Sequence, residues 1–196
     1  MRATNPRYND ILRQTNSFRY QLLDRMRMDC DYWLGNGNRC DKHLWAGNVV
    51  DHCTLMYDLF NSFAYTEQPE WISLDDIRDY AISMGMVDAI LQRLDTEKAR
   101  DEIGEHLNEQ PDCNGLDDFE VYSKQYAEDD AMIELDFELD VECEYHPANY
   151  IDCYCETPAH WTVEDFTVTP TAGRLNLFER EITLNASQLK QLGERL

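Results

Sequence analysis

The sequence predicts an α+β fold, in which an N-terminal helical domain is followed by a small antiparallel β-sheet and a short C-terminal helix. Before about residue 110, apolar residues recur at steps of three and four, the period of an amphipathic helix. From residue 133 they alternate with carboxylates, the period of a strand. Between these patterns, proline, asparagine and glycine cluster at 109–115. The sequence therefore predicts a helical domain over 1–109 and an acidic antiparallel β domain over 116–196.

The first predicted helix runs over 16–34. Leu22, Met26 and Trp33 fall on one face at helical spacing, as the buried stripe of an amphipathic helix does. Glycine and asparagine alternate at 35–38, and both residue types tolerate the positive φ that often follows a helix. These four residues are therefore predicted to end the helix in a structural turn. No Gly-Lys-Ser/Thr sequence follows that would indicate a phosphate-binding loop.

Three further helices are predicted in this domain. The second spans 43–63, where apolar residues again share one face. The third spans 74–83, with Ser73 as its N-cap and acidic residues in its first turn. The fourth begins near residue 87 and extends to about residue 108. Together these helices supply enough apolar surface for a core.

The β domain is predicted from a regular alternation at 133–145, where apolar residues and carboxylates take turns. Further strands are predicted at 150–156, 161–169 and 175–184, separated by Pro158, Pro170 and Gly173. A short C-terminal helix is predicted to begin at Asn185 or Ser187. The strands fit a small antiparallel sheet.

The net charge of −22 is the most informative bulk property of the chain. Residues 101–150 hold seventeen carboxylates against the single base Lys124, whereas residues 1–50 carry a net charge of +3. Such a field repels phosphates and membrane surfaces, so direct binding to nucleic acid or to a membrane is not expected. The charge predicts a partner with a basic surface, such as a host protein or complex that itself binds nucleic acid.

The predicted binding surface is acidic. Its residues are Glu134, Asp136, Glu138, Asp140, Glu142 and Glu144 of the strand, with Asp117, Asp118, Asp129 and Asp130 before it. Residues two apart on a strand are separated by about 6.8 Å, which is comparable to the distance between successive phosphates of one nucleic-acid strand. Like charges in a row repel one another, which suggests that they serve binding. The alternative is that they keep one face of the sheet soluble.

A zinc site is the alternative raised by the C-terminal cysteines and histidines. The residues are Cys143, His146, Cys153, Cys155 and His160. Their spacing is irregular, so buried free thiols are predicted instead, and no metal or cofactor is expected. The acidic residues before the strand lack the spacing of an EF-hand. The histidines stand in no recognisable catalytic motif, and the protein is not expected to be an enzyme.

The remaining cysteines and acidic residues have ordinary interpretations. The odd number of seven cysteines argues against a secreted disulfide framework, and the N-terminus lacks an apolar secretory signal. The expected location is therefore the cytoplasm of a host cell. Asp24, Asp29 and Asp31 share a helix with Arg25 and Arg27, so surface ion pairs are expected there.

Four segments of the helical domain are distinctive: FRYQLLDRM at 18–26, DCDYWLGNGNR at 29–39, KHLWAGN at 42–48 and PEWISLDDI at 69–77. Through these segments, residues 16–83 resemble the large polyvalent protein-associated domains, specifically the eleventh numbered type. The resemblance implies an origin in phages or other mobile genetic elements, where such domains are suspected of countering host defence. It implies no established reaction. Family members are often modules of far larger proteins, so the acidic segment attached here is expected to set the activity.

These observations predict a counter-defence protein of the anti-CRISPR or anti-restriction type, whose acidic surface mimics nucleic acid and inhibits a host complex. The alternative is an interaction module of a mobile element without inhibitory activity, in which the acidic sheet serves solubility. The tryptophans of the helical domain favour that alternative. The sequence does not identify the host complex, and it leaves open whether the protein forms a homodimer.

Overall fold

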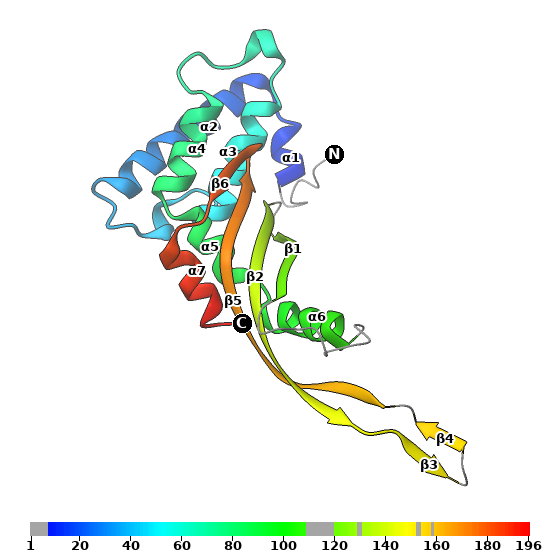
Figure 1. Ribbon diagram of the computed structural model, residues 1–196. Coiled ribbons are helices and arrows are strands. Elements are labelled where there is room, and N and C mark those ends of the chain that lie inside the picture. Colours follow the sequence, from blue (N-terminus) through cyan, green and yellow to red (C-terminus); the bar gives the residue numbers. More distant parts are fainter. Residues whose placement is uncertain (1–7, 109–119, 129–130, 152–153, 158) are drawn as a thin grey trace. The chain divides into compact units, whose positions relative to one another are not determined.

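A computed structural model describes residues 8–108, 120–128, 131–151, 154–157 and 159–196 (Figure 1). Helices lie mostly in the N-terminal part, and an antiparallel sheet and a short helix follow, which confirms the predicted α+β class. The chain divides into two compact units. Unit 1 comprises Met1–Arg93, Ala127–Ala131 and Asn176–Arg180, and unit 2 comprises Leu94–Tyr126, Met132–Leu175 and Glu181–Leu196. The predicted domains over 1–109 and 116–196 stay a prediction.

The helices of unit 1 confirm most of the predicted ones. They are α1 (Asn9–Leu12), α2 (Asn16–Leu34), α3 (Val49–Asn61), α4 (Leu74–Ser83) and α5 (Met86–Arg93), with 3-10 turns η2 (Asp41–His43) and η3 (Tyr65–Glu67). Helices α2 and α4 have the predicted bounds, and Ser73 caps α4 in a reciprocal pair of hydrogen bonds with Asp76. Helix α3 begins later than predicted, because Asn48 accepts a hydrogen bond from the backbone of Asp51 and caps it.

The prediction of one long fourth helix is wrong, because the chain forms two. Helix α5 ends at Arg93, and α6 spans Thr96–Asn108 in unit 2. The Asp95 carboxylate accepts a hydrogen bond from the backbone of Lys98 at 3.0 Å, as an N-cap does. Aspartate at this position therefore starts a new helix within an apolar pattern that reads as continuous.

The core of unit 1 lies between α2, α3 and the helices that follow. Leu23, Met26 and Cys30 from α2 are completely buried, as are Leu55 and Leu59 from α3. Fully buried residues are distributed around α3, so this helix is central to the unit. After α2 the chain takes the positive φ that the sequence predicts, but at Asn38 and Arg39 and not at the glycines.

The described residues form six strands in two sheets, where the sequence predicts four strands in one sheet. Its order is β1 (Glu120–Glu128), β2 (Ala131–His146), β5 (His160–Leu177) and β6 (Arg180–Thr183), and β3 (Asn149–Ile151) pairs antiparallel with β4 (Tyr154–Thr157) as a separate two-stranded sheet. Strand β1 was not predicted, since its sequence does not alternate. The predicted strand at 150–156 is two short strands. Helix α7 (Ala186–Gly193) begins after Asn185, as predicted.

The predicted break at Pro170 and Gly173 is wrong, because β5 continues through both. A Cβ atom at Gly173 would lie 2.7 Å from Leu184 and 2.9 Å from Leu135, so glycine serves close packing here and not a turn. The turn instead lies at Phe178 and Glu179, where φ is 50° and 65°. Positive φ at both central residues matches a tight hairpin turn, although neither residue belongs to the types that favour it.

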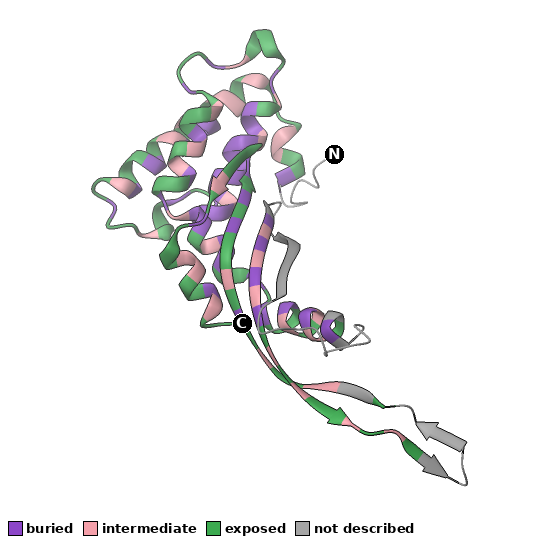
Figure 2. Ribbon diagram, in the orientation of Figure 1, coloured by how far each residue is buried: buried purple, intermediate pink, exposed green. Residues whose placement is uncertain are grey.

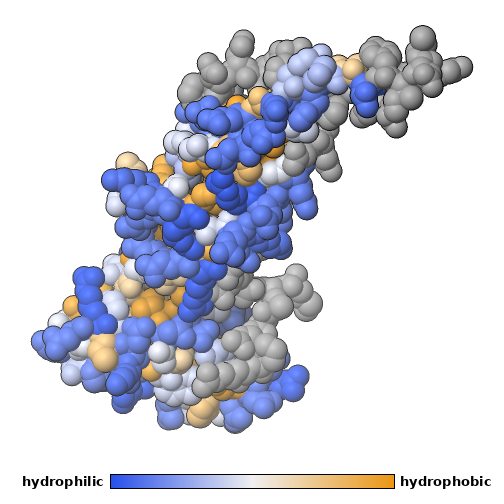
Figure 3. Space-filling model, turned by 90° about the horizontal axis from the view of Figure 1, so that it is seen from below, coloured by the Kyte–Doolittle hydropathy of each residue, from blue (hydrophilic) through white to orange (hydrophobic). Residues whose placement is uncertain are grey.

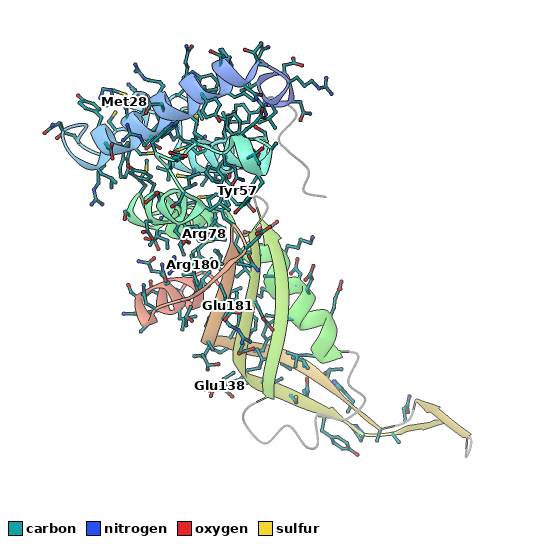
Figure 4. The ribbon with its side chains drawn as sticks, turned by 90° about the horizontal axis from the view of Figure 1, so that it is seen from above. Met28, Tyr57, Arg78, Glu138, Arg180 and Glu181 are labelled. Atoms are coloured by element: carbon teal, nitrogen blue, oxygen red, sulfur yellow. The ribbon has the colours of Figure 1, made fainter. Side chains whose placement is uncertain are left out.

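The Phe178 turn belongs to unit 1 and is held there by two kinds of contact. The Phe178 ring stacks on Tyr57 of α3 with the ring centres 4.5 Å apart. The Arg78 guanidinium of α4 donates two hydrogen bonds, at 2.9 and 2.6 Å, to the Phe178 carbonyl. Figure 4 labels Tyr57, Arg78 and Arg180 in this region. These contacts fix a backbone conformation that phenylalanine rarely adopts.

Unit 2 has a core of its own beneath the first part of β2, residues 133–139, which we call its inner half. Ile133, Leu135 and Phe137 of β2 are completely buried, and Ile103 and Leu107 of α6 are equally buried. Figure 2 shows buried residues alternating along this part of β2. Within the described part of the chain, none of the helices has the length and apolar character needed to span a membrane.

Candidate functional site

Strand β2 has two halves that differ in burial. In the inner half, Leu139 and the three apolar residues before it at alternate positions are completely buried. In the outer half the same alternation continues, but Val141 and Cys143 are half-buried and Tyr145 is 51% exposed. There β2 and β5 continue side by side beyond α6 (Figures 1 and 2). The outer half is therefore a two-stranded ribbon that lacks the cover of the inner half.

The predicted carboxylates of β2 all alternate with apolar residues, but their surroundings differ along the strand. Glu134 lies 3.5 Å from the guanidinium of Arg174 on β5. The backbone carbonyl of Asp136 accepts a hydrogen bond from the Thr171 hydroxyl. Glu134 and Asp136 thus lie where side-chain contacts join β2 to β5. The cation beside Glu134 is Arg174 of the same protein.

Four predicted carboxylates follow on the outer part of the strand, and we call them the outer carboxylates: Glu138, Asp140, Glu142 and Glu144. Glu138 is half-buried and the other three are exposed. Figure 4 shows Glu138 pointing away from the sheet. On the face of the molecule drawn in Figure 3, hydrophilic residues predominate and apolar ones form small groups.

The sequence around this row contains no lysine or arginine to neutralise it. From residue 131 to residue 173 there are ten carboxylates and no lysine or arginine. Two of these carboxylates, Glu164 and Asp165, are exposed on β5, and Arg100 of α6 lies 3.4 Å from Asp165. Glu164 adds to the negative charge of the ribbon, and sequence reasoning missed it because it lies on another strand.

The predicted residues Asp117, Asp118, Asp129 and Asp130 lie outside the described residues. Their contribution to the acidic surface therefore stays a prediction. The side chains of Cys153, Cys155 and His160, which the sequence raised as zinc ligands, are likewise outside the description. Cys143 is half-buried.

Helix α2 of unit 1 carries a second group of charges, which form the predicted ion pairs, although Asp29 is buried and not on the surface as predicted. Arg25 lies 2.9 Å from Asp29, and Arg27 lies 3.0 Å from Asp24 and 3.2 Å from Asp31. The Tyr80 hydroxyl donates a hydrogen bond of 2.5 Å to Asp31. Burial, followed by this hydrogen bond, raises the pKa of Tyr80 to about 12. The network thus joins α2 to α4.

Comparison with protein families gives one match, and it falls on this helical part. Residues 16–84 match the family model of large polyvalent protein-associated domain 11. The match confirms the resemblance predicted from sequence and covers about a third of the chain. It supports an association with the proteins of phages and mobile elements. Neither the comparison with curated proteins nor that with solved structures gives a match.

The tryptophans of the large polyvalent protein-associated domain differ in exposure. Trp33 is buried and donates a hydrogen bond to Asp41 at 3.1 Å, so its role is structural. Trp45 is 45% exposed and Trp71 is 44% exposed. Trp71 lines a hollow of about 290 Å³ together with Arg27. These two exposed rings are able to contact another molecule.

The domain also contains a buried pair of thiols. Cys30 of α2 and Cys53 of α3 are both completely buried and free. Their hydrogen bond, together with burial, raises the pKa of Cys53 well above its ordinary value. Cys30 also lies 3.6 Å from the sulfur of Met56. The thiol of Cys53 is therefore protonated, and the pair packs as part of the core.

Proposed function

We propose that this protein binds the basic surface of a host complex that acts on nucleic acid, and that it does so through the outer carboxylates. The complex is of the CRISPR-effector or restriction type, and the bound protein excludes nucleic acid from it. The observation that carries this proposal is the uncovered row of four carboxylates in a segment without lysine or arginine. The match of residues 16–84 to a domain associated with large polyvalent proteins supports the mobile-element setting.

Repulsion among the outer carboxylates favours binding to a positively charged partner. Adjacent carboxylates on one face of a strand repel one another at about 6.8 Å, and the ribbon does not offset this repulsion with its own cations. A partner that presents lysines and arginines relieves it on binding. Complementary charge also steers the approach of the two molecules and makes the association rate fall as salt rises.

The geometry of the ribbon suits entry into a channel. The outer carboxylates follow one another in a line along β2, as the phosphates do along a nucleic-acid strand, and Glu164 adds a further negative charge from β5. A channel lined by arginine and lysine recognises mainly this line of negative charge. The apolar face of the same ribbon, with Tyr145 half-exposed, supplies area that is not charged.

Affinity capture tests the proposal directly. The tagged full-length chain is incubated with host lysate at about 50 mM and about 500 mM salt, and the bound proteins are identified by mass spectrometry. We expect capture of a nucleic-acid-binding complex at low salt that weakens at high salt, and competition by added DNA or RNA. Capture of a partner that does not bind nucleic acid, and that added DNA and RNA leave bound, would contradict the proposal.

The second candidate function is a protein-interaction module without inhibitory activity. The observation that favours it is the set of large exposed apolar side chains in unit 1, namely Phe18, Met28, Tyr32, Trp45, Tyr65, Trp71 and Ile82. Exposed aromatic residues are enriched at interfaces between proteins. Changing Trp45 and Trp71 to alanine separates the candidates, since only the module loses its partner while the acidic ribbon is intact.

A further inference from the structure

Near the outer end of β2, three potential metal ligands from two strands lie together. They are Glu144 and His146 of β2 and Glu164 of β5. Glu144 and His146 are two positions apart, so they project from the same face of the strand. Strand pairing then brings Glu164 beside them, although eighteen or more residues separate it from either in sequence.

The ligand atoms of the three residues all lie within 4.8 Å of one another. The His146 Nε2 atom lies 4.0 Å from a Glu144 oxygen. The same nitrogen is 2.7 Å from the hydroxyl of Thr162, which in turn lies 3.4 Å from a Glu164 oxygen. A zinc ion with bonds of about 2.0–2.2 Å needs ligand atoms about 3.4 Å apart in a tetrahedron. Small rotations of the exposed glutamates close the difference.

The kind of donor atom decides the kind of cation. Imidazole nitrogen suits zinc, iron and other divalent transition metals, whereas calcium and magnesium take oxygen ligands almost alone. Three carboxylates alone would not favour a transition metal over calcium or magnesium. His146 is therefore the residue that makes this group suited to a transition metal.

The surrounding charge favours a cation at this place. Glu142 projects from the same face about 6.8 Å from Glu144, and Asp140 follows at twice that distance. No lysine or arginine lies between residues 131 and 173 to compete for the carboxylates. A divalent ion would also remove the repulsion between Glu144 and Glu164, which face each other across two strands.

We propose that Glu144, His146 and Glu164 form a binding site for a divalent transition-metal cation such as Zn²⁺. The site holds the ion by three side chains from one face of the ribbon and leaves its outer side open. This inference does not depend on the proposed function, because the ion binds whether or not the acidic row meets a partner.

Calorimetric titration of the full-length chain with Zn²⁺ tests the site. We expect one ion per chain with micromolar affinity. The variants His146→Gln and Glu164→Gln should each bind at least about tenfold more weakly, since loss of an outer-shell group alone costs about 10- to 100-fold. Glu138→Gln is the matched control, because it removes one charge from the same strand about 20 Å away, beyond the Debye length of about 8 Å. It should bind like the original chain.

Cobalt supplies a second measurement that does not depend on affinity. Co²⁺ bound to nitrogen and oxygen gives visible bands without the thiolate charge-transfer bands of a cysteine site, and His146→Gln should abolish the visible bands. The proposal is overturned if the original chain binds no zinc, or if His146→Gln binds as tightly as Glu138→Gln. Thiolate bands would also overturn it, because they would assign the ion to the cysteines. Far-UV circular dichroism confirms that each variant is folded.

Discussion

Neutralising the outer carboxylates should raise stability while lowering affinity for the partner. The variant changes Glu138, Asp140 and Glu142 to Gln, Asn and Gln, which removes three charges and keeps the side-chain shapes. Two unit charges about 6.8 Å apart in water repel by about 0.6 kcal/mol, and screening at 0.15 M salt lowers this to about 0.3 kcal/mol. The variant removes four adjacent repulsions, including that between Asp136 and Glu138 and that between Glu142 and Glu144. The expected gain in the free energy of unfolding is therefore about 1 kcal/mol.

The matched control removes three charges elsewhere on the surface. Glu70, Asp101 and Glu105 are exposed and are changed to Gln, Asn and Gln, so net charge rises equally in both variants. In thermal unfolding followed by circular dichroism, the ribbon variant should gain about 2 °C in Tm. This gain should shrink as salt is added, because the repulsion is screened. The control should show a smaller change.

Partner affinity is the second readout of the same pair of variants. Exposed ionic contacts contribute about 0.2 to 1 kcal/mol each, so loss of three weakens binding about tenfold and flattens its salt dependence. The control should keep its affinity and its salt dependence. The reasoning is refuted if both variants weaken binding equally, since net charge alone would then act. It is also refuted if the ribbon variant melts below the control, since its carboxylates would then stabilise the fold.

Three further predictions concern the fold. Phe178→Ala should lower the free energy of unfolding by about 3 kcal/mol in urea titration, because it removes a buried ring stacked on Tyr57; an unchanged midpoint would contradict this anchoring. Ser73→Ala should cost about 1 kcal/mol in the same assay through loss of the N-cap of α4, and Ser73→Asn should restore most of it. Cys30 and Cys53 are completely buried, so they should react with a maleimide only after unfolding; mass spectrometry that finds them labelled in the native protein would disprove their burial.

Helix starts and strands that are determined by neighbouring residues could be predicted from the sequence. Ser73 with Asp76, and Asn185 with Gln188, form reciprocal caps within a single turn, and both helix starts were located from local sequence. The alternation of β2 likewise depends on adjacent residues and identified a strand correctly. These features share a physical cause, because the residues that determine each of them lie within four positions of one another in the sequence.

Features that depend on distant residues could not be predicted in this way. Gly173 resembles a strand end in sequence, but its missing side chain makes room for Leu184 and Leu135. The turn at Phe178 uses a residue that is rare there, and contacts with Tyr57 and Arg78 stabilise it from far along the chain. Glu164 joins the group at the end of β2 only through strand pairing. In each case the deciding contact is tertiary.

The two halves of β2 carry the same sequence pattern in different surroundings. In the inner half the alternation buries Leu135 and Phe137, and the polar face meets Arg174, so the pattern is accounted for by folding. In the outer half the identical pattern buries its apolar residues only partly, and the carboxylates there lack a basic neighbour within the segment. Folding alone favours lysine among such carboxylates, because mixed charges attract across a sheet face. The continuation of the acidic row past the core therefore supports the proposal that this row binds a partner of opposite charge.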